Sequence, residues 1–576
     1  MKNQELSKIF NEIARFLQID GVAFKPYAYE KAAISLEGLS EDVAETYVRG
    51  GRKALEEIPG IGRAMSDHIE EYLKTGKIKF YEEMKKKLPV KWDELLSLEG
   101  LGPKKIKVLY EKLGVKNLKD LAKVVKKHKV APLFGFGQKT EENIVQGLDF
   151  LKRSKGRSLL KDVLPFATEI LKKIEKLKEV EKVSLAGSLR RKKETIGDVD
   201  FLVVSKNPKK VMKFFCNLPG VEKVWGKGGT KASVHMKEGF DMDLRVVPLK
   251  SYGSALQYFT GSQDHNIATR KIAIEKGLKL SEWGVFSGSK QIAGKTEEEV
   301  YKAIGLKWMS PEIRENGGEI EASLNHKLPQ LVELKDIKGD LHIHSNWEDL
   351  KGSKDSIEML AKKGMELGYE YIGISDHTND LKVEKSLNEK HILKQIEYIK
   401  KLNQSFEKRG IKFKILTGCE ANIRRDGTID VEDEVLSKLD YVIAGIHSIH
   451  KMEKEEMTKR IIKAMQNKNV DILAHPTGRI VGEREEYLMD FDKILKTAYE
   501  TGTILEINSS TRLDLRDLYI RRAKSEGVKM LINTDTHKKD QMDFMEYGIS
   551  QARRGWAEKK DIINTESVEN LLKYFK

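Results

Sequence analysis

Cysteine and long apolar runs are scarce in this sequence. Only Cys216 and Cys419 occur, far apart in the chain, so no disulfide framework is predicted and a reducing cytosol fits. No run of about 18 apolar residues is present, so we expect no membrane-spanning segment and no membrane partner. The first residues lead into an amphipathic helical pattern and not into an apolar signal core. These absences favour a cytoplasmic protein.

Acidic residues are outnumbered by basic ones. The chain has 104 Lys and Arg against 89 Asp and Glu, which gives a formal net charge of +15 and a pI of about 9.2. A basic balance favours a polyanionic partner through non-specific attraction, but it says little about the fold. At 576 residues the chain should hold roughly four domains.

Acidic residues open two apolar segments in the middle of the chain. Residues 198–204 read Asp-Val-Asp-Phe-Leu-Val-Val, which predicts a β-strand with Asp198 and Asp200 on one face of its start. Residues 240–247 (Phe-Asp-Met-Asp-Leu-Arg-Val-Val) predict a second strand with acidic residues on one face. Carboxylates on neighbouring strands repel one another unless a cation lies between them, so this pattern favours two Mg²⁺ ions.

A Gly-Ser turn precedes the first acidic strand. Gly187 and Ser188 expose backbone N–H groups, which suit a phosphate, and Arg190 and Arg191 follow at once. Metals and a triphosphate together indicate in-line displacement at phosphorus. The alternative, a polar strand end with two solvated aspartates, leaves the turn and the arginines as coincidences.

This set resembles the nucleotidyltransferase palm of family X DNA polymerases, the group that includes DNA polymerase beta. The resemblance implies that Asp198, Asp200 and Asp243 bind the catalytic Mg²⁺ or Mn²⁺ ions. It also implies that Arg191, beside the Gly187–Ser188 turn, binds the triphosphate. Asp241 departs from some vertebrate relatives, which have an arginine there.

A second stretch matches the nucleotide pocket of that family in order and spacing. Residues 258–262 read Tyr-Phe-Thr-Gly-Ser, and Asn266 and Arg270 follow. The resemblance implies that the turn of Tyr258, Phe259 and Gly261 packs against the incoming sugar. It implies further that Asn266 contacts the base and that Arg270 lies near the template. The alternative is an aromatic pair that belongs only to the core.

Glycine turns of one type recur in the first quarter of the chain. Residues 58–63 (Ile-Pro-Gly-Ile-Gly-Arg) and 98–105 (Leu-Glu-Gly-Leu-Gly-Pro-Lys-Lys) each precede a helical pattern, and residues 134–140 are a weaker third copy. These are helix-hairpin-helix signatures, in which glycines allow close approach to a phosphate and the helix N-terminus donates N–H groups. Ordinary helix-connecting turns are the alternative. The predicted contacts to the DNA backbone are Gly60, Gly62, Gly102, Lys104 and Lys105.

The first unit resembles the small N-terminal domain of family X polymerases, because residues 25–32 match its Lys-x-x-Ala-Tyr pattern. Some members carry a lysine there that removes a 5′-deoxyribose phosphate through an imine. His68 occupies the matching position and Ala64 that of a second lysine. Imidazole cannot form this imine, so we do not expect lyase activity through His68.

Histidine-rich strand ends characterise the rest of the chain after residue 337. His342 and His344 lie on one face of a predicted strand, and later apolar segments also end in His, Glu or Asp. Helical segments alternate with these strands, which predicts a β/α barrel with its site on the C-terminal face. The alternative, unrelated polar residues at successive strand ends, requires a coincidence. Such a ligand set suits Zn²⁺, Mn²⁺ or Fe.

This half resembles the polymerase-and-histidinol-phosphatase (PHP) domain, a metal-dependent phosphoesterase. The resemblance implies three metal ions, Zn²⁺ and/or Mn²⁺. Leu350 departs from relatives that have Gly after the aspartate. The implied ligands are His342, His344, Asp349, His377, Glu420, His447, His475, Asp535 and His537.

Together the resemblances predict a multidomain α+β and α/β protein with helical helix-hairpin-helix domains, a palm with a mixed sheet and a distorted (β/α)7-type PHP barrel. Their order is that of bacterial and archaeal family X polymerases. The predicted parts are a helical domain (1–84), a second helix-hairpin-helix subdomain (85–151), the palm (152–249), a nucleotide-selection subdomain (250–311), a linker (312–337) and the PHP domain (338–576).

The function that these expectations favour is short-gap filling in DNA repair. A nucleoid-associated monomer would bind gapped or primed DNA and dNTPs, and its PHP domain would act as a 3′-5′ exonuclease, with abasic-site cleavage and trimming of 3′ ends as further activities. One alternative is a nucleotidyltransferase for RNA or a small molecule, fused to a phosphoesterase. Another is a DNA-binding scaffold with a silent polymerase site.

Overall fold

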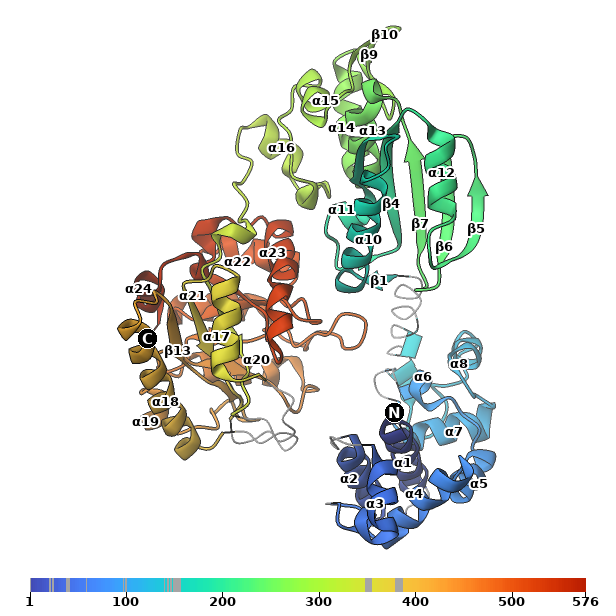
Figure 1. Ribbon diagram of the computed structural model, residues 1–576, viewed down its shortest axis with the longest axis vertical. Helices are drawn as coiled ribbons and strands as arrows, with labels where there is room; N and C mark the ends of the chain where they lie inside the picture. Colours follow the sequence, from blue (N-terminus) through green and yellow to red (C-terminus); the bar gives the residue numbers. More distant parts are fainter. Residues whose placement is uncertain are drawn as a thin grey trace. The chain divides into compact units, whose positions relative to one another are not determined.

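The computed structural model describes the chain in two compact units, residues 1–155 and 156–576 (Figure 1). It covers all residues except 1, 20–21, 23–24, 38–41, 59, 97, 99–100, 139, 142–143, 146–147, 149–156, 348–354, 379–386 and 576. Among the helices in this described part, none is long and apolar enough to cross a membrane.

The first unit is helical. Leu6, Phe10, Ile13 and Leu17 are buried, and their spacing of three or four residues places them on one face of the first helix. The other helices pack around this face and form one apolar cluster with it. The described helices are α1 (Lys2–Ile19), α2 (Lys25–Glu37), α3 (Val43–Glu56), α4 (Arg63–Thr75), α5 (Lys79–Lys87), α6 (Trp92–Leu96), α7 (Pro103–Leu113) and α8 (Leu118–Val125).

The second unit begins with a five-stranded mixed sheet in the order β2-β4-β7-β6-β5, in which only the central β4–β7 pair is parallel. A two-stranded β1–β3 pair lies beside it. The elements are β1 (Ser158–Leu159), α10 (Leu160–Glu175), β2 (Val180–Leu185), α11 (Gly187–Arg190), β3 (Thr195–Ile196), β4 (Asp198–Ser205), α12 (Pro208–Cys216), β5 (Val221–Lys227), β6 (Lys231–Met236) and β7 (Asp241–Val246).

Successive side chains of β4 point to opposite faces of the sheet and so contribute to two separate apolar cores. Val199, Phe201 and Val203 pack with α10 and α12 on one face of the sheet, and Figure 1 shows both helices on that face. Leu202 and Val204 pack against the next helix on the other face. Since even-numbered residues share a face, the acidic residues at the start of β4 lie on the same face as this second core.

The region after the sheet combines helices with a small antiparallel sheet in the order β10-β9-β8. Val285, Val300 and Tyr301 are at the centre of its own apolar cluster. The elements are η1 (Leu249–Ser251), α13 (Tyr252–Thr260), α14 (Gln263–Glu275), β8 (Lys279–Ser281), β9 (Gly284–Ser287), β10 (Lys290–Ala293), α15 (Glu297–Ala303), η2 (Pro311–Ile313), α16 (Glu319–Leu324) and η3 (Leu334–Asp336).

The segment 312–337, which its polar composition predicts to be a linker, is packed. Arg314 and Glu319 are fully buried; Arg314 forms an ion pair with Glu297 at 2.6 Å, and Glu319 Oε1 accepts a hydrogen bond from His265 Nδ1 at 2.6 Å. Buried charges persist when they are paired, so these two polar residues belong to the packed interior, whereas others in the segment, such as Lys327 and Lys335, are exposed.

The last part of the chain contains parallel strands in two sheets, β11-β12-β13 and β14-β15-β16-β17-β18. Only two residues separate β13 from β14, so the described strands make seven β/α repeats. The strands are β11 (Gly339–Ile343), β12 (Tyr371–Ile374), β13 (Lys414–Thr417), β14 (Glu420–Asn422), β15 (Ile443–Gly445), β16 (Ile472–Leu473), β17 (Ile504–Asn508) and β18 (Met530–Asn533).

Helices alternate with these strands as the sequence predicts. Isolated parallel bridges connect the two sheets, between residues 343 and 536 and between residues 377 and 420; each joins the terminal residue of one strand to a residue just beyond the end of another. The helices are α17 (Ile357–Glu366), α18 (Glu389–Lys408), α19 (Asp433–Leu436), α20 (Lys454–Met465), α21 (Phe491–Thr501), α22 (Asp517–Ser525), η4 (Lys539–Phe544), α23 (Met545–Arg554), η5 (Lys559–Asp561), η6 (Ile563–Thr565), α24 (Val568–Leu571) and η7 (Leu572–Tyr574).

Candidate active sites

Three carboxylates meet at the parallel β4–β7 pair. Asp200 lies directly opposite Asp243 in the register, and Asp198 opens the same strand. Burial raises the pKa of Asp200 to about 7, and the charges of Asp198 and Asp243 add to the rise. A carboxylate that resists ionisation beside two others is the arrangement that a divalent cation relieves. The three predicted ligands therefore fit metal ions.

A small pocket of about 110 Å³ opens beside these carboxylates, lined by Asp200, Asp243, Lys231, Arg245 and Phe259 among others. The Lys231 Nζ atom lies 3.1 Å from Asp243 Oδ2. The pocket thus combines acidic groups for cations with basic groups for an anion, as a metal-bound nucleotide requires.

The Gly-Ser turn lies against this carboxylate cluster. Gly187 has a φ of +61°, and a Cβ atom there would lie 2.1 Å from Asp200 Oδ2, so only glycine allows this approach. The Oγ atom of Ser188 is buried and has no hydrogen-bond partner among the described residues. A buried unsatisfied hydroxyl next to a predicted triphosphate site is consistent with a ligand contact.

The helix α11 and the residue that follows it carry the two predicted arginines, which have different surroundings. Arg190 donates to both oxygens of Glu297 at 2.8 Å, and Arg314 pairs with the same carboxylate. The Arg191 Nε atom donates to Glu315 Oε1 at 3.0 Å. Arg190 thus ties the palm to the following region, as sequence reasoning did not predict.

Removal of the Glu297 carboxylate should destabilise the protein. Burial opposes its ionisation, yet Arg314 and Arg190 hold the pKa of Glu297 well below its usual range. We expect Glu297→Ala to cost about 3–5 kcal/mol in the free energy of unfolding, because the fully buried guanidinium of Arg314 and the partly buried one of Arg190 lose their partner. Thermal unfolding checks this, with exposed Glu298→Ala as the matched control on the same helix.

The pH dependence of that effect has a defined sign. A carboxyl whose pKa is lowered by folding stabilises above its unfolded pKa and loses this contribution as the pH falls through its folded pKa. The Glu297→Ala penalty should therefore be complete near pH 7 and shrink only in strong acid. An equal melting temperature for wild type and variant at pH 7 would contradict the role of this ion pair.

The predicted nucleotide-pocket residues follow the palm on α13 and α14. Phe259 lies in the pocket lining, with the Arg245 guanidinium 4.7 Å from its ring, and Tyr258 packs edge-to-face on it at 5.1 Å. The Asn266 side chain donates to Tyr258 O at 2.7 Å and accepts from Gln257 at 2.8 Å. Contact of Asn266 with a base therefore requires this amide to exchange partners.

Two further residues of that prediction lie close to the same turn. The Arg270 Nε atom donates to Asn266 O at 3.1 Å. Gly261 has a φ of +69°, and a Cβ atom there would lie 3.1 Å from Arg191 Nη1. The structure thus brings the 258–262 turn and the triphosphate-site arginine together.

The helix-hairpin-helix glycines occupy helix starts in the first unit. Gly62 and Gly102 are the N-caps of α4 and α7, without a side-chain cap, and a Cβ atom would meet nothing within 4 Å at either. Lys104 and Lys105 lie in the first turn of α7, where cations oppose the helix dipole unless an anion is bound. Gly60 has a φ of +90° and lies close to Lys31.

His68 is packed as an aromatic residue. Its ring stacks between Tyr29 and Phe80, and Nε2 lies 3.0 Å from the Tyr29 hydroxyl. Burial lowers the pKa of His68 despite the nearby carboxylates of Glu71 and Asp67. The ring completes a core and has no feature of an imine-forming nucleophile.

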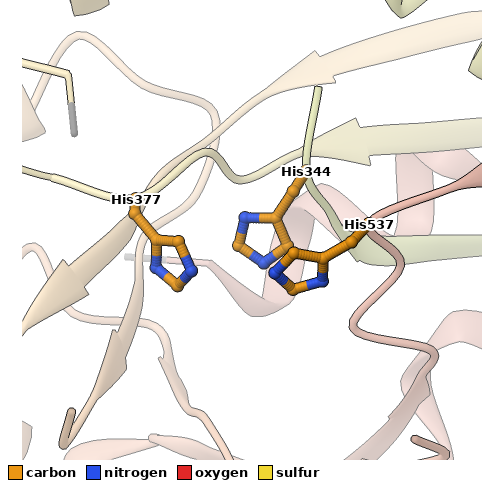
Figure 2. A group of neighbouring side chains, drawn as sticks. All are labelled: His344, His377 and His537. Carbon is orange, nitrogen blue, oxygen red and sulfur yellow. The ribbon is translucent and has the colours of Figure 1, made fainter. Parts of the chain in front are cut away.

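Histidines from several strand ends converge in the second predicted site. His344, His377 and His537 point their ring nitrogens toward one another (Figure 2), with one ligand atom from each lying within 4.8 Å of the others. Two more groups of this kind share Glu420. They are His342 with His344 and Glu420, and His377 with Glu420 and His447.

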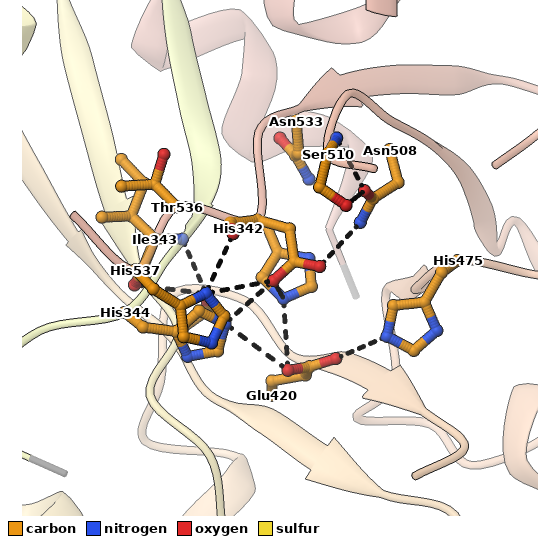
Figure 3. Close-up of polar contacts among 12 residues, drawn as sticks. His342, Ile343, His344, Glu420, His475, Asn508, Ser510, Asn533, Thr536 and His537 are labelled. Atoms are coloured by element: carbon orange, nitrogen blue, oxygen red, sulfur yellow. Dashed lines mark hydrogen bonds and ion pairs between the residues drawn. The ribbon is translucent and has the colours of Figure 1, made fainter. Parts of the chain in front are cut away.

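Glu420 is at the centre of these groups (Figure 3). Its Oε1 atom lies 2.9 Å from Nε2 of both His447 and His475, and its Oε2 atom lies 2.8 Å from His377 Nδ1 and 3.2 Å from His342 Nε2. The side chain is 1% exposed. One buried carboxylate surrounded by four imidazoles matches a bridging metal ligand.

The electrostatics of this site are those of a cation-binding centre. Burial opposes ionisation of Glu420, yet His447, His342 and His377 hold its pKa well below the usual range. Burial lowers the pKa of His475 to about 4, so this imidazole is neutral, the form that binds metals. Its Nδ1 atom is buried without a hydrogen-bond partner among the described residues.

Asp535 is the second carboxylate of the site. Its Oδ1 atom lies 3.4 Å from His344 Nε2 and 3.7 Å from His342 Nε2. Asp535 and His475 both have positive φ values, +54° and +29°, and strain of this kind is typical of functional sites. The structure therefore brings together eight of the nine predicted ligands, and Asp349 lies outside the described residues.

A supporting layer of polar residues was not predicted from the sequence. Glu506 accepts from His342 Nδ1 at 2.6 Å and from the backbone of His475 at 2.8 Å. The side-chain amide oxygen of Asn422, Oδ1, lies 2.9 Å from His447 Nδ1. Such partners fix the orientation of metal-binding imidazoles. The only signal for Glu506 is an acidic residue inside the apolar run Ile-Leu-Glu-Ile-Asn.

Known protein families match several parts of the chain. Residues 1–78 match a helix-hairpin-helix domain family and residues 93–149 a SAM-like helix-hairpin-helix tandem. Residues 255–315 match the DNA polymerase beta thumb, and residues 340–510 match the PHP domain. These matches confirm the predicted fold class and both resemblances, in the predicted order.

Individual proteins are similar over different lengths. The DNA polymerase/3′-5′ exonuclease PolX of Bacillus subtilis is 37% identical over 582 residues, which cover 100% of both chains. DNA polymerase lambda of Arabidopsis thaliana is 24% identical over 54% of this chain and 62% of its own. A probable phosphatase of Clostridium acetobutylicum is 33% identical over 21% of this chain and 52% of its own.

Proposed function

This chain belongs to the family X DNA polymerases that carry a C-terminal PHP domain, the family of PolX, and we propose that it fills short gaps in DNA and trims 3′ ends. Nucleotide addition takes place at the palm carboxylates and 3′-5′ hydrolysis at the histidine cluster. The observation that carries the proposal is the β4–β7 register, which places Asp200 opposite Asp243 in the lining of one pocket, with Asp198 at the start of the same strand as Asp200.

In the palm, Asp198, Asp200 and Asp243 would hold divalent ions, and Mg²⁺ or Mn²⁺ suits an all-oxygen ligand set with phosphate. When bound, these ions stabilise the attacking and leaving oxygens of in-line displacement. The protein itself binds the triphosphate through the Gly187 turn and Arg191, whose guanidinium is a charged hydrogen-bond donor to phosphate.

In the PHP domain the nitrogen-rich ligand set favours Zn²⁺ or Mn²⁺, and the nine predicted ligands suit three ions. Bound ions there would activate water for attack on a phosphodiester. Glu506 and Asn422 orient the imidazoles of His342 and His447, so these ligands keep one ring position.

We also propose the six-part division given by the sequence, with segment 312–337 as a packed connection instead of a free spacer. The partners are gapped or primed DNA and a dNTP, bound by a monomer in the nucleoid. The first unit would grip the DNA backbone through Gly60, Gly62, Gly102, Lys104 and Lys105, because helix N-termini and glycine turns contact phosphate without reading sequence.

Binding of gapped DNA should weaken steeply with salt, because phosphate contacts release counterions. Lys104→Gln should reduce the slope of log K against log salt by about 0.9, the value for one phosphate contact. Lys123→Gln on α8, with a 76% exposed side chain, is the charge-matched control and should change it less. Fluorescence anisotropy measures both slopes.

A bulky side chain at the helix-hairpin-helix turn before Lys104 tests the same DNA contact in a second way. Gly102→Val adds a side chain where the folded protein has open space, so it should weaken DNA binding without unfolding the unit. Gly60 is less suitable because its positive φ makes a substitution strained. Equal DNA affinity for Gly102→Val and wild type would contradict close phosphate approach at this turn.

One assay tests the whole proposal. A labelled primer on a gapped duplex is incubated with and without dNTPs, in Mg²⁺, Mn²⁺ or Zn²⁺. We expect extension by one or a few nucleotides with dNTPs and shortening from the 3′ end without them. Transfer of nucleotides to RNA or to a small-molecule acceptor in preference to DNA would indicate a nucleotidyltransferase with a different substrate. Shortening of the primer without any extension would indicate a silent polymerase site.

A further inference from the structure

The predicted triphosphate-binding arginine is held on two sides by residues that follow the palm. Arg191 donates from Nε to Glu315 Oε1 at 3.0 Å and from Nη1 to the backbone oxygen of Thr260. Its side chain is 12% exposed. Among the described residues, Nη2 of this guanidinium makes no hydrogen bond, so this one nitrogen remains for a ligand.

A residue of the PHP domain holds both the backbone and the partner of Arg191. Arg554, the last residue of α23, donates from Nη1 to Arg191 O at 3.0 Å and to Glu315 Oε1 at 3.1 Å. Its Nη2 atom donates to Asp517 at 2.6 Å. The Arg554 side chain is 6% exposed, so its contact with Glu315 is a buried interaction and not a solvent-exposed surface ion pair.

The residues after Arg191 are also bound by the PHP domain. Lys192 Nζ lies 2.8 Å from Glu546 Oε1, and Glu194 receives Arg479 Nη2 at 2.6 Å. Leu513 packs into the apolar cluster of the palm. The turn that ends the triphosphate site is therefore fixed from the PHP side at several points.

Three cations and two carboxylates make up this network, and Glu315 is the carboxylate that all three cations face. Glu315 faces Arg191, Arg554 and, at 3.9 Å, Lys193, while Asp517 neutralises Arg554 from its other side. If Arg554 were absent, Glu315 would lose its main anchor outside the palm. The Arg191 guanidinium would then lose a fixed orientation, not its charge.

We propose that Arg554 and Glu315 are positioning residues for the nucleotide site: Arg554 anchors Glu315, and Glu315 together with the Thr260 carbonyl orients Arg191 so that Nη2 binds the triphosphate of the incoming dNTP. This inference rests on the proposed polymerase function. It assigns the PHP domain a part in nucleotide binding that is separate from its metal ligands, which lie at strand ends and not on α23.

The test measures single-nucleotide addition on gapped DNA by the full-length chain. Arg554→Gln should raise KM for dNTP roughly tenfold, the low end for loss of a residue that orients a ligand-binding group, with kcat within about twofold. Arg553→Gln is the matched control, because this neighbour pairs with Glu312 at 2.7 Å and makes no bond to Arg191. The 3′ nuclease activity of each preparation reports that the PHP domain is folded.

Glu315 variants separate positioning from competition. Glu315→Ala should raise KM for dNTP, and Glu315→Gln should restore part of the loss because its amide oxygen still accepts from Arg191. A fall in KM in both variants would mean that Glu315 competes with the triphosphate, and it would overturn the proposal. An unchanged KM in folded Arg554→Gln would overturn it too.

These outcomes differ from failure of the proposed function. If wild type extends no primer, the polymerase assignment itself is wrong. If wild type extends and Arg554→Gln matches Arg553→Gln in KM, only the positioning role is wrong. If Arg554→Gln loses nuclease activity and melts at lower temperature, the Glu315→Ala and Glu315→Gln pair decides, since Glu315 is 27% exposed and lies outside the PHP domain.

Discussion

Asp198→Ala, Asp200→Ala and Asp243→Ala should each abolish primer extension and leave DNA affinity nearly unchanged. Each variant removes a ligand from the carboxylate cluster at the β4–β7 pair, and the charge on the metals and triphosphate is then poorly balanced in the transition state. A loss of about 4 kcal/mol of transition-state stabilisation corresponds to roughly a thousandfold in rate. Single-turnover extension on gapped DNA measures it.

Asp241→Asn is the matched control for this series. Asp241 lies on the same strand two residues from Asp243, but its carboxylate accepts from Trp225 Nε1 at 3.0 Å and lies 2.7 Å from His235 Nδ1. We therefore expect the control to retain extension. Robust extension by any of the three alanine variants would show that the metal-site assignment is wrong, and loss in the control would add a fourth acidic residue to it.

Both clusters were predictable from sequence because their chemistry limits the residue types. Only carboxylates and imidazoles suit the implied metals, and parallel strands bring their ends to one edge, so residues as distant as His342 and Asp535 could be grouped from strand periodicity alone. The structure brings those two side chains within 3.7 Å. The roles of the individual ligands remain predictions.

Contacts between distant charged residues could not be predicted in the same way. Glu506 supports His342 from another strand, and Arg554 contacts Glu315 across 239 positions of sequence. The sequence around a single buried acidic residue or a helix-terminal arginine does not indicate which distant residue the side chain contacts. The burial of Arg314 in segment 312–337 has no local signal for the same reason, since Arg314 is polar in sequence and is fully buried against Glu297.

This packing also decides how the nuclease of the PHP domain is best tested. Val332 and Ile337 belong to the main apolar cluster of the PHP domain, so a fragment that begins at residue 338 would lose both. It would also expose Leu513 and Tyr547, which pack with the palm. Exposed apolar surface of this kind favours aggregation. The nuclease is therefore better tested by point variants in the full-length chain.

His344→Ala, and the pair Asp535→Ala with His537→Ala, should eliminate 3′ nuclease activity and spare nucleotide addition. The ligand atoms of His344, His377 and His537 lie within 4.8 Å of one another, so loss of one imidazole leaves a metal under-coordinated. We expect at least about a thousandfold loss of hydrolysis, several kcal/mol in the transition state. Metal content by mass spectrometry should fall in parallel, which gives a readout that does not depend on activity.

The two active sites should remain separable in these variants because the ligands come from strand ends of the PHP domain, whereas the contact to the nucleotide site runs through α23 and Arg554. His391→Ala, an exposed histidine on α18, is the matched control and should retain both activities. The nuclease should also prefer Mn²⁺ or Zn²⁺ over Mg²⁺, since nitrogen ligands favour those ions. If folded His344→Ala lost extension as completely as hydrolysis, the metals of the PHP domain would also be needed to position DNA for extension. The assignment of two separate sites would then be wrong.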